Sequence, residues 1–137
     1  MKLVYPVVIQ KNPDKGEKYR LIYIPDIDSH TEGESVGDCI NMARDAIGLY
    51  CLSLEEDDNK EFPEATPLDK VKCDEDSIVT LVDVDYDEYK KQYSKRTVRR
   101  NVTLPSWINY EAEKSGVNVS AILQKALISE LHLTPKS

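Results

Sequence analysis

The stretch Thr97-Val98-Arg99-Arg100-Asn101-Val102-Thr103-Leu104-Pro105 decides the fold predicted for the C-terminal part of the chain. Its residues alternate along most of its length, and successive side chains of a β-strand point to opposite faces. One face would carry the apolar residues Val98, Val102 and Leu104, with Arg100 interrupting the row. The other would carry Arg99, Asn101 and Thr103, whose guanidinium, amide and hydroxyl are groups that bind base edges in the major groove of DNA.

Two helices are predicted after this strand. The first runs from Pro105-Ser106 to about Ser115, and Gly116 fits the position that follows a helix C-terminus. Asn118 is placed to cap a last helix over Val119–Leu131, where an apolar stripe comprises Ile122, Leu123, Ala126, Leu127 and Leu131. Residues 94–137 therefore predict a strand–helix–helix module.

Such a module is too small to be stable alone. Chains of about 40 residues bury little apolar surface, and a single strand cannot satisfy its own backbone donors and acceptors. Both problems disappear if two copies pair their strands antiparallel and interlock their helices. We therefore expect at least a homodimer.

Two other interpretations of this segment remain open. The strand could present its polar face only to solvent. The helix–Gly–helix pattern also fits a helix-turn-helix motif, whose second helix would need base-reading side chains near its start. In that position the chain offers Val119, Ser120 and Ala121, with Gln124 as the only long polar side chain, so the paired strand is favoured.

The first 93 residues predict a small domain in the order β-β-α-β. The predicted strands are Lys2–Gln10, with Pro6 favouring a position near a sheet edge, Tyr19–Ile24 and Ser77–Val84, with a polar loop over Asp28–Glu34 and a short helix or linker over Tyr86–Tyr93.

A long helix is predicted after Ser35, which fits an N-cap with Asp38 three residues on. Spacings of three and four put one apolar face together, comprising Val36, Ile40, Ala43, Ile47, Tyr50, Cys51 and Leu54. Gly48 within the helix predicts close packing against the sheet. The acidic run Glu55–Asp58 opposes the helix dipole, so fraying is expected there.

Charge divides the chain at the same point as the predicted elements. Residues 94–137 hold seven basic and three acidic residues, a net charge of +4, whereas residues 1–93 carry −11. The basic part suits a polyanion, and the acidic part suits a basic protein partner. We therefore predict two domains, residues 1–93 and 94–137.

The remaining composition favours a cytoplasmic protein. The sequence holds no apolar run of about 18 residues that would cross a membrane, and Val4–Ile9 is too short for a signal peptide. The three cysteines, Cys39, Cys51 and Cys73, form no C-x-x-C pair and are predicted to be reduced and buried.

Catalytic and metal sites find little support, so we expect no enzyme and no cofactor. The first strand has no acidic residue that could join a two-metal nuclease site. Asp83, Asp85 and Asp87 begin like a calcium loop, but Glu88 and Ser94 stand where glycine and glutamate are needed. No nucleophile-elbow serine or glycine-rich phosphate loop is present.

The C-terminal segment resembles the ribbon-helix-helix family through T-V-R-R-N-V-T-L-P, the Gly116 turn and the N-V-S that opens the last helix. The resemblance implies that Arg99, Asn101 and Thr103 read bases. It also implies phosphate contacts in two places. At the start of the last helix these are Asn118, Val119 and Ser120; beside the strand they are Arg96 and Arg100.

The N-terminal part resembles the HicB antitoxin family. The motifs Y-P-V-V-I, Y-R-L-I-Y-I-P-D-I, T-E-G-E-S and D-V-D-Y-D-E-Y-K occur in the family's order over residues 1–93. The resemblance implies an α+β fold, a partial RNase H-like β-β-α-β domain followed by a ribbon-helix-helix module. The first domain would bind and mask a small mRNA-degrading HicA-like toxin, and the second would bind operator DNA and repress the shared operon.

The resemblance also implies toxin contacts from the loop after the second strand, with Asp26, Asp28, His30 and Glu32 as candidates. The alternative is a stand-alone dimeric transcriptional repressor whose N-terminal domain senses a small ligand.

Asn101→Ala is expected to weaken specific operator binding by about 1–3 kcal/mol, because it removes one base contact. A gel shift with DNA from upstream of the protein's own gene measures the effect. Equal binding by the variant and the wild type would refute the base-reading role of Asn101.

Overall fold

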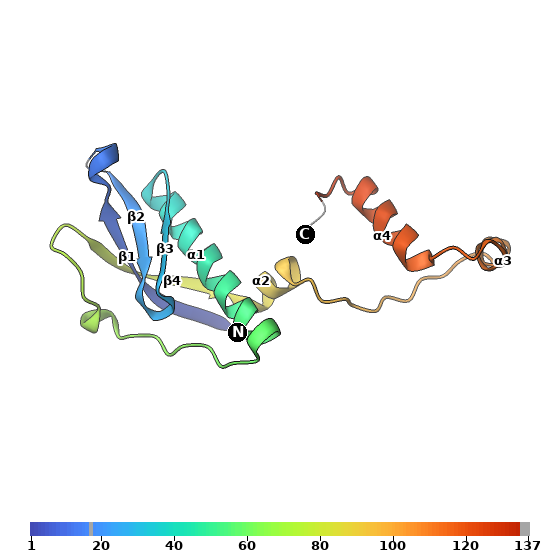
Figure 1. The fold of residues 1–137 in the computed structure, drawn as a ribbon, viewed down its shortest axis with the longest axis horizontal. Helices are drawn as coiled ribbons and strands as arrows, with labels where there is room; N and C mark the ends of the chain where they lie inside the picture. The colour runs from blue at the N-terminus through green and yellow to red at the C-terminus, as the bar shows by residue number, and fades with distance from the viewer. Residues whose placement is uncertain (17, 135–137) are drawn as a thin grey trace. The chain divides into compact units, whose positions relative to one another are not determined.

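The computed structural model describes residues 1–16 and 18–134, and the chain divides into two compact units. The first unit is Met1–Arg96, and the second begins at Thr97. The second predicted domain starts at residue 94, whereas the structure keeps residues 94–96 with the first unit. Each unit is described by itself below (Figure 1).

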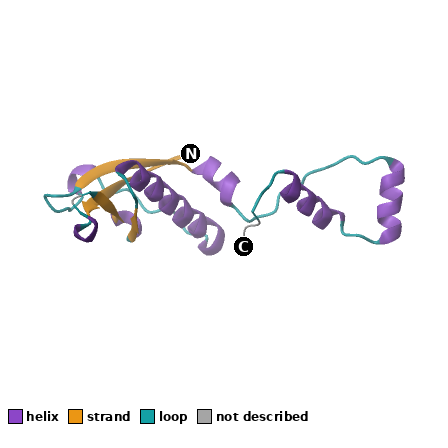
Figure 2. Cartoon of the chain, turned by 90° about the horizontal axis from the view of Figure 1, so that it is seen from above, coloured by secondary structure: helices purple, strands orange, loops and turns teal. Residues whose placement is uncertain are grey.

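The first unit is a four-stranded antiparallel sheet with one long helix across one face (Figures 1 and 2). Its strands are β1 (Lys2–Lys11), β2 (Tyr19–Ile24), β3 (Ser29–Glu32) and β4 (Ile78–Asp85), in the spatial order β3-β2-β1-β4. Helix α1 (Val36–Ser53) separates β3 from β4, and α2 (Tyr86–Tyr93) follows β4 directly. The predicted strands and helices are all present in this unit.

Strand β3 lies within residues 28–34, for which the sequence predicts a polar loop. Its register pairs Leu21 with Glu32 and Ile24 with Ser29. The strand forms because its backbone bonds to β2 after a tight turn at Asp28, where φ is 45°. Edge strands tolerate polar side chains, so hydrophobic alternation gave no signal.

Pro6 lies in a strand that is interior to the sheet, although an edge position was predicted. The conflict is local, because β1 pairs with β4 from Lys2 to Ile9 but with β2 only from Val8 onward. Pro6 therefore lies in the half of β1 that has a single neighbouring strand, where a missing N–H is tolerated.

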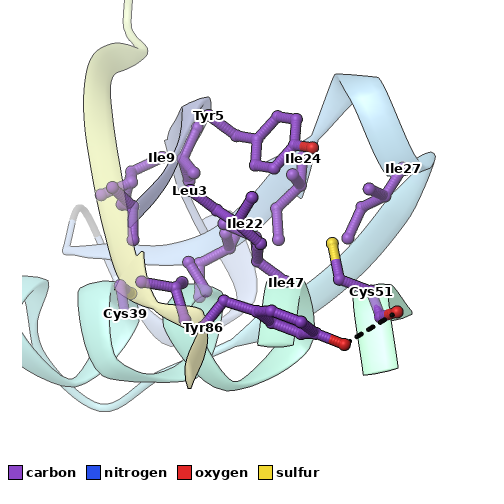
Figure 3. Packing of buried hydrophobic residues seen from close by; sticks show 14 of the residues in the cluster. Leu3, Tyr5, Ile9, Ile22, Ile24, Ile27, Cys39, Ile47, Cys51 and Tyr86 are labelled. Carbon is purple, nitrogen blue, oxygen red and sulfur yellow. Dashed lines mark hydrogen bonds between the residues drawn. The ribbon is translucent and has the colours of Figure 1, made fainter. Parts of the chain in front are cut away.

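The core fills the space between α1 and the sheet (Figure 3). Alternate residues of the strands face the helix, and α1 contributes mainly small side chains. The principal members are Leu3, Tyr5, Val7, Ile9, Ile22, Ile24, Val82, Val84, Cys39, Ala43, Ile47, Cys51 and Tyr86. The predicted helix face was partly wrong, since Val36 and Tyr50 are exposed whereas Cys39 and Leu52 are buried.

The cysteines are unbridged, as expected, but only two are buried. Cys39 and Cys51 lie in the core, whereas Cys73 is exposed. Burial raises the pKa of Cys51 to about 11, so its thiol stays protonated at neutral pH. Cys51 is therefore a packing residue.

The acidic end of α1 is ordered, contrary to the predicted fraying. The chain continues as a π-helical turn over Leu54–Asp58, and Asn59 ends the turn with a φ of 50°. The Tyr86 hydroxyl donates to Glu55 at 2.6 Å, and Lys90 Nζ donates to the same carboxylate at 3.0 Å. Charge from α2 therefore offsets the unfavourable dipole interaction.

The second unit contains α3 (Ser106–Ser115) and α4 (Val119–Glu130). Gly116 follows α3 with a φ of 67°, and the Asn118 side chain accepts from Ala121 N at 3.0 Å, which confirms both predicted helix boundaries. Residues 97–105 form no strand in the described single chain. This is the result expected for a strand that needs a second copy, and it leaves the pairing itself a prediction.

Gly48 permits a close approach between helices rather than between helix and sheet, which corrects the sequence interpretation. A Cβ there would lie 2.5 Å from Cε2 of Tyr89 in α2. The Tyr89 hydroxyl donates to the Asp45 carboxylate at 3.0 Å, which holds the ring in place.

Gly48→Ala is expected to destabilise the protein by about 1–3 kcal/mol, because the overpacking exceeds the gain in helix propensity. Gly37→Ala is the control: its Cβ meets only Ser35 Oγ, at 3.9 Å. Urea unfolding followed by circular dichroism measures both variants. If Gly48→Ala were as stable as Gly37→Ala, the close packing would be refuted.

Candidate DNA-binding and partner-binding surfaces

The predicted base-reading residues lie in an exposed, extended segment. Arg99, Asn101 and Thr103 are all exposed, and Val98, from the predicted apolar face, is 89% exposed. The segment therefore has no covered face in the single chain. Its backbone and its apolar side chains are both available for a partner.

A groove joins the start of this segment to α4. It has a volume of about 610 Å³ and is lined by Thr97, Val98, Arg99, Arg100, Ser120, Leu123, Gln124 and Leu127. The structure thus brings Arg99 and Arg100 to the same groove as Ser120, one of the predicted phosphate contacts. Leu123 and Gln124 were not predicted as site residues.

The start of α4 has the geometry of an anion-binding helix terminus. Asn118 uses its side chain to cap the helix at Ala121 N. The backbone N–H groups of Val119 and Ser120 belong to the first turn, where no intrahelical acceptor exists. N–H groups of this kind at a helix N-terminus suit an anion through main-chain contacts and the helix dipole.

The second unit has no hydrophobic core of its own. No residue from 97 to 134 is buried in the described chain, and only Ala112, Leu123 and Ile128 reach intermediate burial. The exposed large apolar side chains are Val98, Val102, Leu104, Trp107, Ile108, Tyr110, Val117, Val119, Ile122, Leu127, Leu131 and Leu133. An apolar surface of this extent on a small unit marks an interaction site.

Arg96, a predicted phosphate contact, lies in the first unit and not with Arg99 and Arg100. Its Nη2 donates to the Glu56 carbonyl at 3.3 Å, and its Nε lies 3.8 Å from the Glu56 carboxylate. The sequence interpretation missed Glu56, because it lies in a run of four acidic residues with no feature to distinguish it.

Asp26, a candidate for partner contact, is engaged within the first unit. Its carboxylate accepts from Thr66 Oγ1 at 2.6 Å and from Thr66 N at 3.1 Å. The Tyr5 hydroxyl also donates to the Pro63 carbonyl at 2.7 Å. These bonds hold the loop after α1 against the β2–β3 turn, so Asp26 has a structural role.

Asp28 and His30 are exposed and share a partner in Tyr23. The Tyr23 hydroxyl donates to the Asp28 carboxylate at 3.2 Å, and the His30 ring stacks on the Tyr23 ring with centroids 4.6 Å apart. Desolvation of the half-buried ring and this hydrogen bond raise the pKa of Tyr23. Glu32 follows in the same edge strand, opposite Leu21.

Asp83 and Asp85 in β4 and Asp87 in α2 have separate partners. Asp83 pairs with Lys2 and Arg44, both at 3.2 Å, and these cations hold the pKa of its carboxyl below the usual range. Asp85 caps α2 through Glu88 N, and Asp87 bonds the N-terminal amine. Over residues 1–16 and 18–134, no cluster of three or more acidic, His or Cys residues could hold a metal ion.

No helix among the described residues is long and apolar enough to span a bilayer.

One family model matches most of the chain, and solved structures share its fold. The model of the HicB-like antitoxin of bacterial toxin–antitoxin systems matches residues 5–126. A chain of a toxin–antitoxin complex from Streptococcus pneumoniae has a similar fold, with a TM-score of 0.63 and 23% identity over 95% of this chain and 99% of that chain. The crystal structure of the Burkholderia pseudomallei antitoxin HicB gives a TM-score of 0.53 and 22% identity over 94% and 98%. No curated protein matches the sequence significantly.

Proposed function

Since the chain belongs to the HicB-like antitoxin family of toxin–antitoxin systems, we propose that it has two binding activities. Its first unit binds and masks a small HicA-type mRNA-degrading toxin. Its second unit dimerises as a ribbon-helix-helix module, binds operator DNA and represses the shared operon.

The proposal that the second unit dimerises and binds DNA is supported mainly by the exposed apolar surface of that unit. A second copy of the same chain matches it best, because an alternating segment can pair antiparallel with itself about a two-fold axis. Such pairing buries Val98, Val102 and Leu104 against the helices of both copies. It also satisfies backbone groups that have no strand partner in the single chain.

The same pairing directs Arg99, Asn101 and Thr103 outward on two adjacent strands. A two-stranded ribbon fits the major groove of B-form DNA, where these side chains can bond to base edges. Arg100 and the start of α4 then supply phosphate contacts, which position the ribbon without reading sequence. The net charge of +4 over residues 94–137 supports approach to DNA.

The dimer hypothesis predicts opposite outcomes for two neighbouring residues. Val102→Asp is expected to raise the dimer dissociation constant by about 100-fold or more, since a carboxylate would be buried without a partner. Thr103→Asp lies on the other face and is expected to leave the dimer intact while abolishing operator binding by charge repulsion. Sedimentation of the full chain and gel shifts measure both properties.

If Val102→Asp stayed dimeric at the wild-type concentration range, the shared ribbon would be wrong. A monomeric Thr103→Asp variant would also contradict the hypothesis, because the result would mean that the face carrying Thr103 lies in the dimer interface.

The proposal that the first unit binds a toxin is supported by its net charge and by the unpaired edge of its sheet. Residues 1–93 carry a net charge of −11. Strand β3 lies at an edge of the sheet and contains His30 and Glu32, and Asp28 lies in the turn just before it. An RNA-cleaving toxin needs a basic surface for its substrate, and an acidic surface of matching shape would cover it.

Asp28→Asn is expected to slow association with the toxin about two- to tenfold, because steering charges act mainly on the association rate. Asparagine tolerates the left-handed backbone at this position and can still accept the Tyr23 hydrogen bond. Asp76→Asn, which removes an exposed charge near β4 at the opposite edge, is the control. Surface plasmon resonance at two salt concentrations measures both variants, and a salt-independent association rate would contradict an electrostatic origin.

A further inference from the structure

The linker after α2 is tied back to the first unit by one glutamate. Ser94 Oγ donates to the Glu56 carboxylate, and Arg96 N donates to Ser94 Oγ at 3.2 Å. The Arg96 guanidinium bonds the Glu56 carbonyl and lies beside its carboxylate. The Glu56 side chain is only 14% exposed, whereas Arg96 is 59% exposed.

The turn that carries Glu56 is bonded to α2. The π-helical turn continues α1, and Glu55 on the same turn accepts from both Tyr86 and Lys90 of α2. Helix α2 is itself packed on α1 through Gly48 and Tyr89. Glu56 therefore holds a fixed position at the point where the chain leaves the first unit.

We propose that Glu56 is an intramolecular competitor of DNA phosphate for Arg96. The proposal rests on the DNA binding proposed above. Arg96 stands three residues before Arg99, in the basic segment that would approach the phosphate backbone. Its guanidinium cannot keep the Glu56 contacts and also move to a phosphate, so a phosphate contact from Arg96 requires the Glu56–Arg96 contact to break.

The strength of the contact suits a competitor that DNA can displace. Arg96 is largely exposed, so water and salt screen its guanidinium although Glu56 is mostly buried, and a screened ion pair contributes little to stability. A phosphate on DNA offers Arg96 a stronger field than a single carboxylate, and it adds the entropy of counterion release. Glu56 therefore sets a threshold on DNA affinity without preventing binding.

Glu56→Gln is expected to tighten operator binding about two- to fivefold, the factor that corresponds to losing one exposed ion pair. Glutamine keeps the shape and can still accept from Ser94. Asp58→Asn is the matched control, because it removes the same charge from an exposed position on the same turn. The control is expected to change affinity less than Glu56→Gln does.

Measuring DNA affinity for Arg96→Ala and for the double variant Glu56→Gln/Arg96→Ala completes a double-mutant cycle. Glu56→Gln is expected to have no effect on DNA affinity once Arg96 is absent. Equal effects of Glu56→Gln with and without Arg96, or equal effects of Glu56→Gln and Asp58→Asn, would overturn the proposal, since general charge repulsion would then suffice.

Trypsin gives a readout that does not depend on DNA, because it cleaves after arginine only when the side chain can enter its specificity pocket. In the free full-length protein, Glu56→Gln is expected to speed cleavage after Arg96 several-fold relative to cleavage after Arg99 and Arg100. Unchanged relative cleavage would refute the contact. If the wild type binds no operator DNA but trypsin shows the release, the proposed DNA binding and the competition fail while the contact stands.

Discussion

The pairing of β1 with β4 is the interaction on which the first unit depends. It joins Lys2–Ile9 to Ile78–Asp85, segments separated by most of the unit. This pairing brings Tyr86 into the core and places α2 against the end of α1. There the Glu55 carboxylate accepts hydrogen bonds from the Tyr86 hydroxyl and from Lys90. The exit of the chain toward the second unit is thereby fixed by tertiary contacts that local sequence does not contain.

A different constraint applies to the second unit: the extended segment over residues 97–105 needs hydrogen-bond partners for its backbone. Gly116 ends α3 and Asn118 caps α4, yet no apolar side chain in the described part of this unit is buried. Good local structure without a core is the condition in which folding and association become one process. The DNA binding proposed for this module would then depend on the concentration of the protein.

Net charge differs between the two parts of the chain, −11 over residues 1–93 and +4 over residues 94–137. The acidic first unit and the basic second unit would attract opposite ligands, and the Glu56–Arg96 contact lies where the two charge types meet. A chain with separated charges of opposite sign can pair with itself as well as with its partners. The contact at the linker is a local instance of that competition, and the exposure of Arg96 keeps it weak.

The sequence by itself determined most element boundaries, because caps and turns act locally. Ser35, Asn118 and Gly116 behave as their types predict. Only the tertiary structure decided β3, the packing partner of Gly48 and the roles of Asp26 and Glu56. Strand β3 forms through backbone pairing with β2, and its polar side chains give no sequence signal for that pairing. Asp26 accepts a hydrogen bond from Thr66, which lies 40 residues away in sequence. Such contacts depend on which segments the sheet brings together, and periodicity carries no information about that.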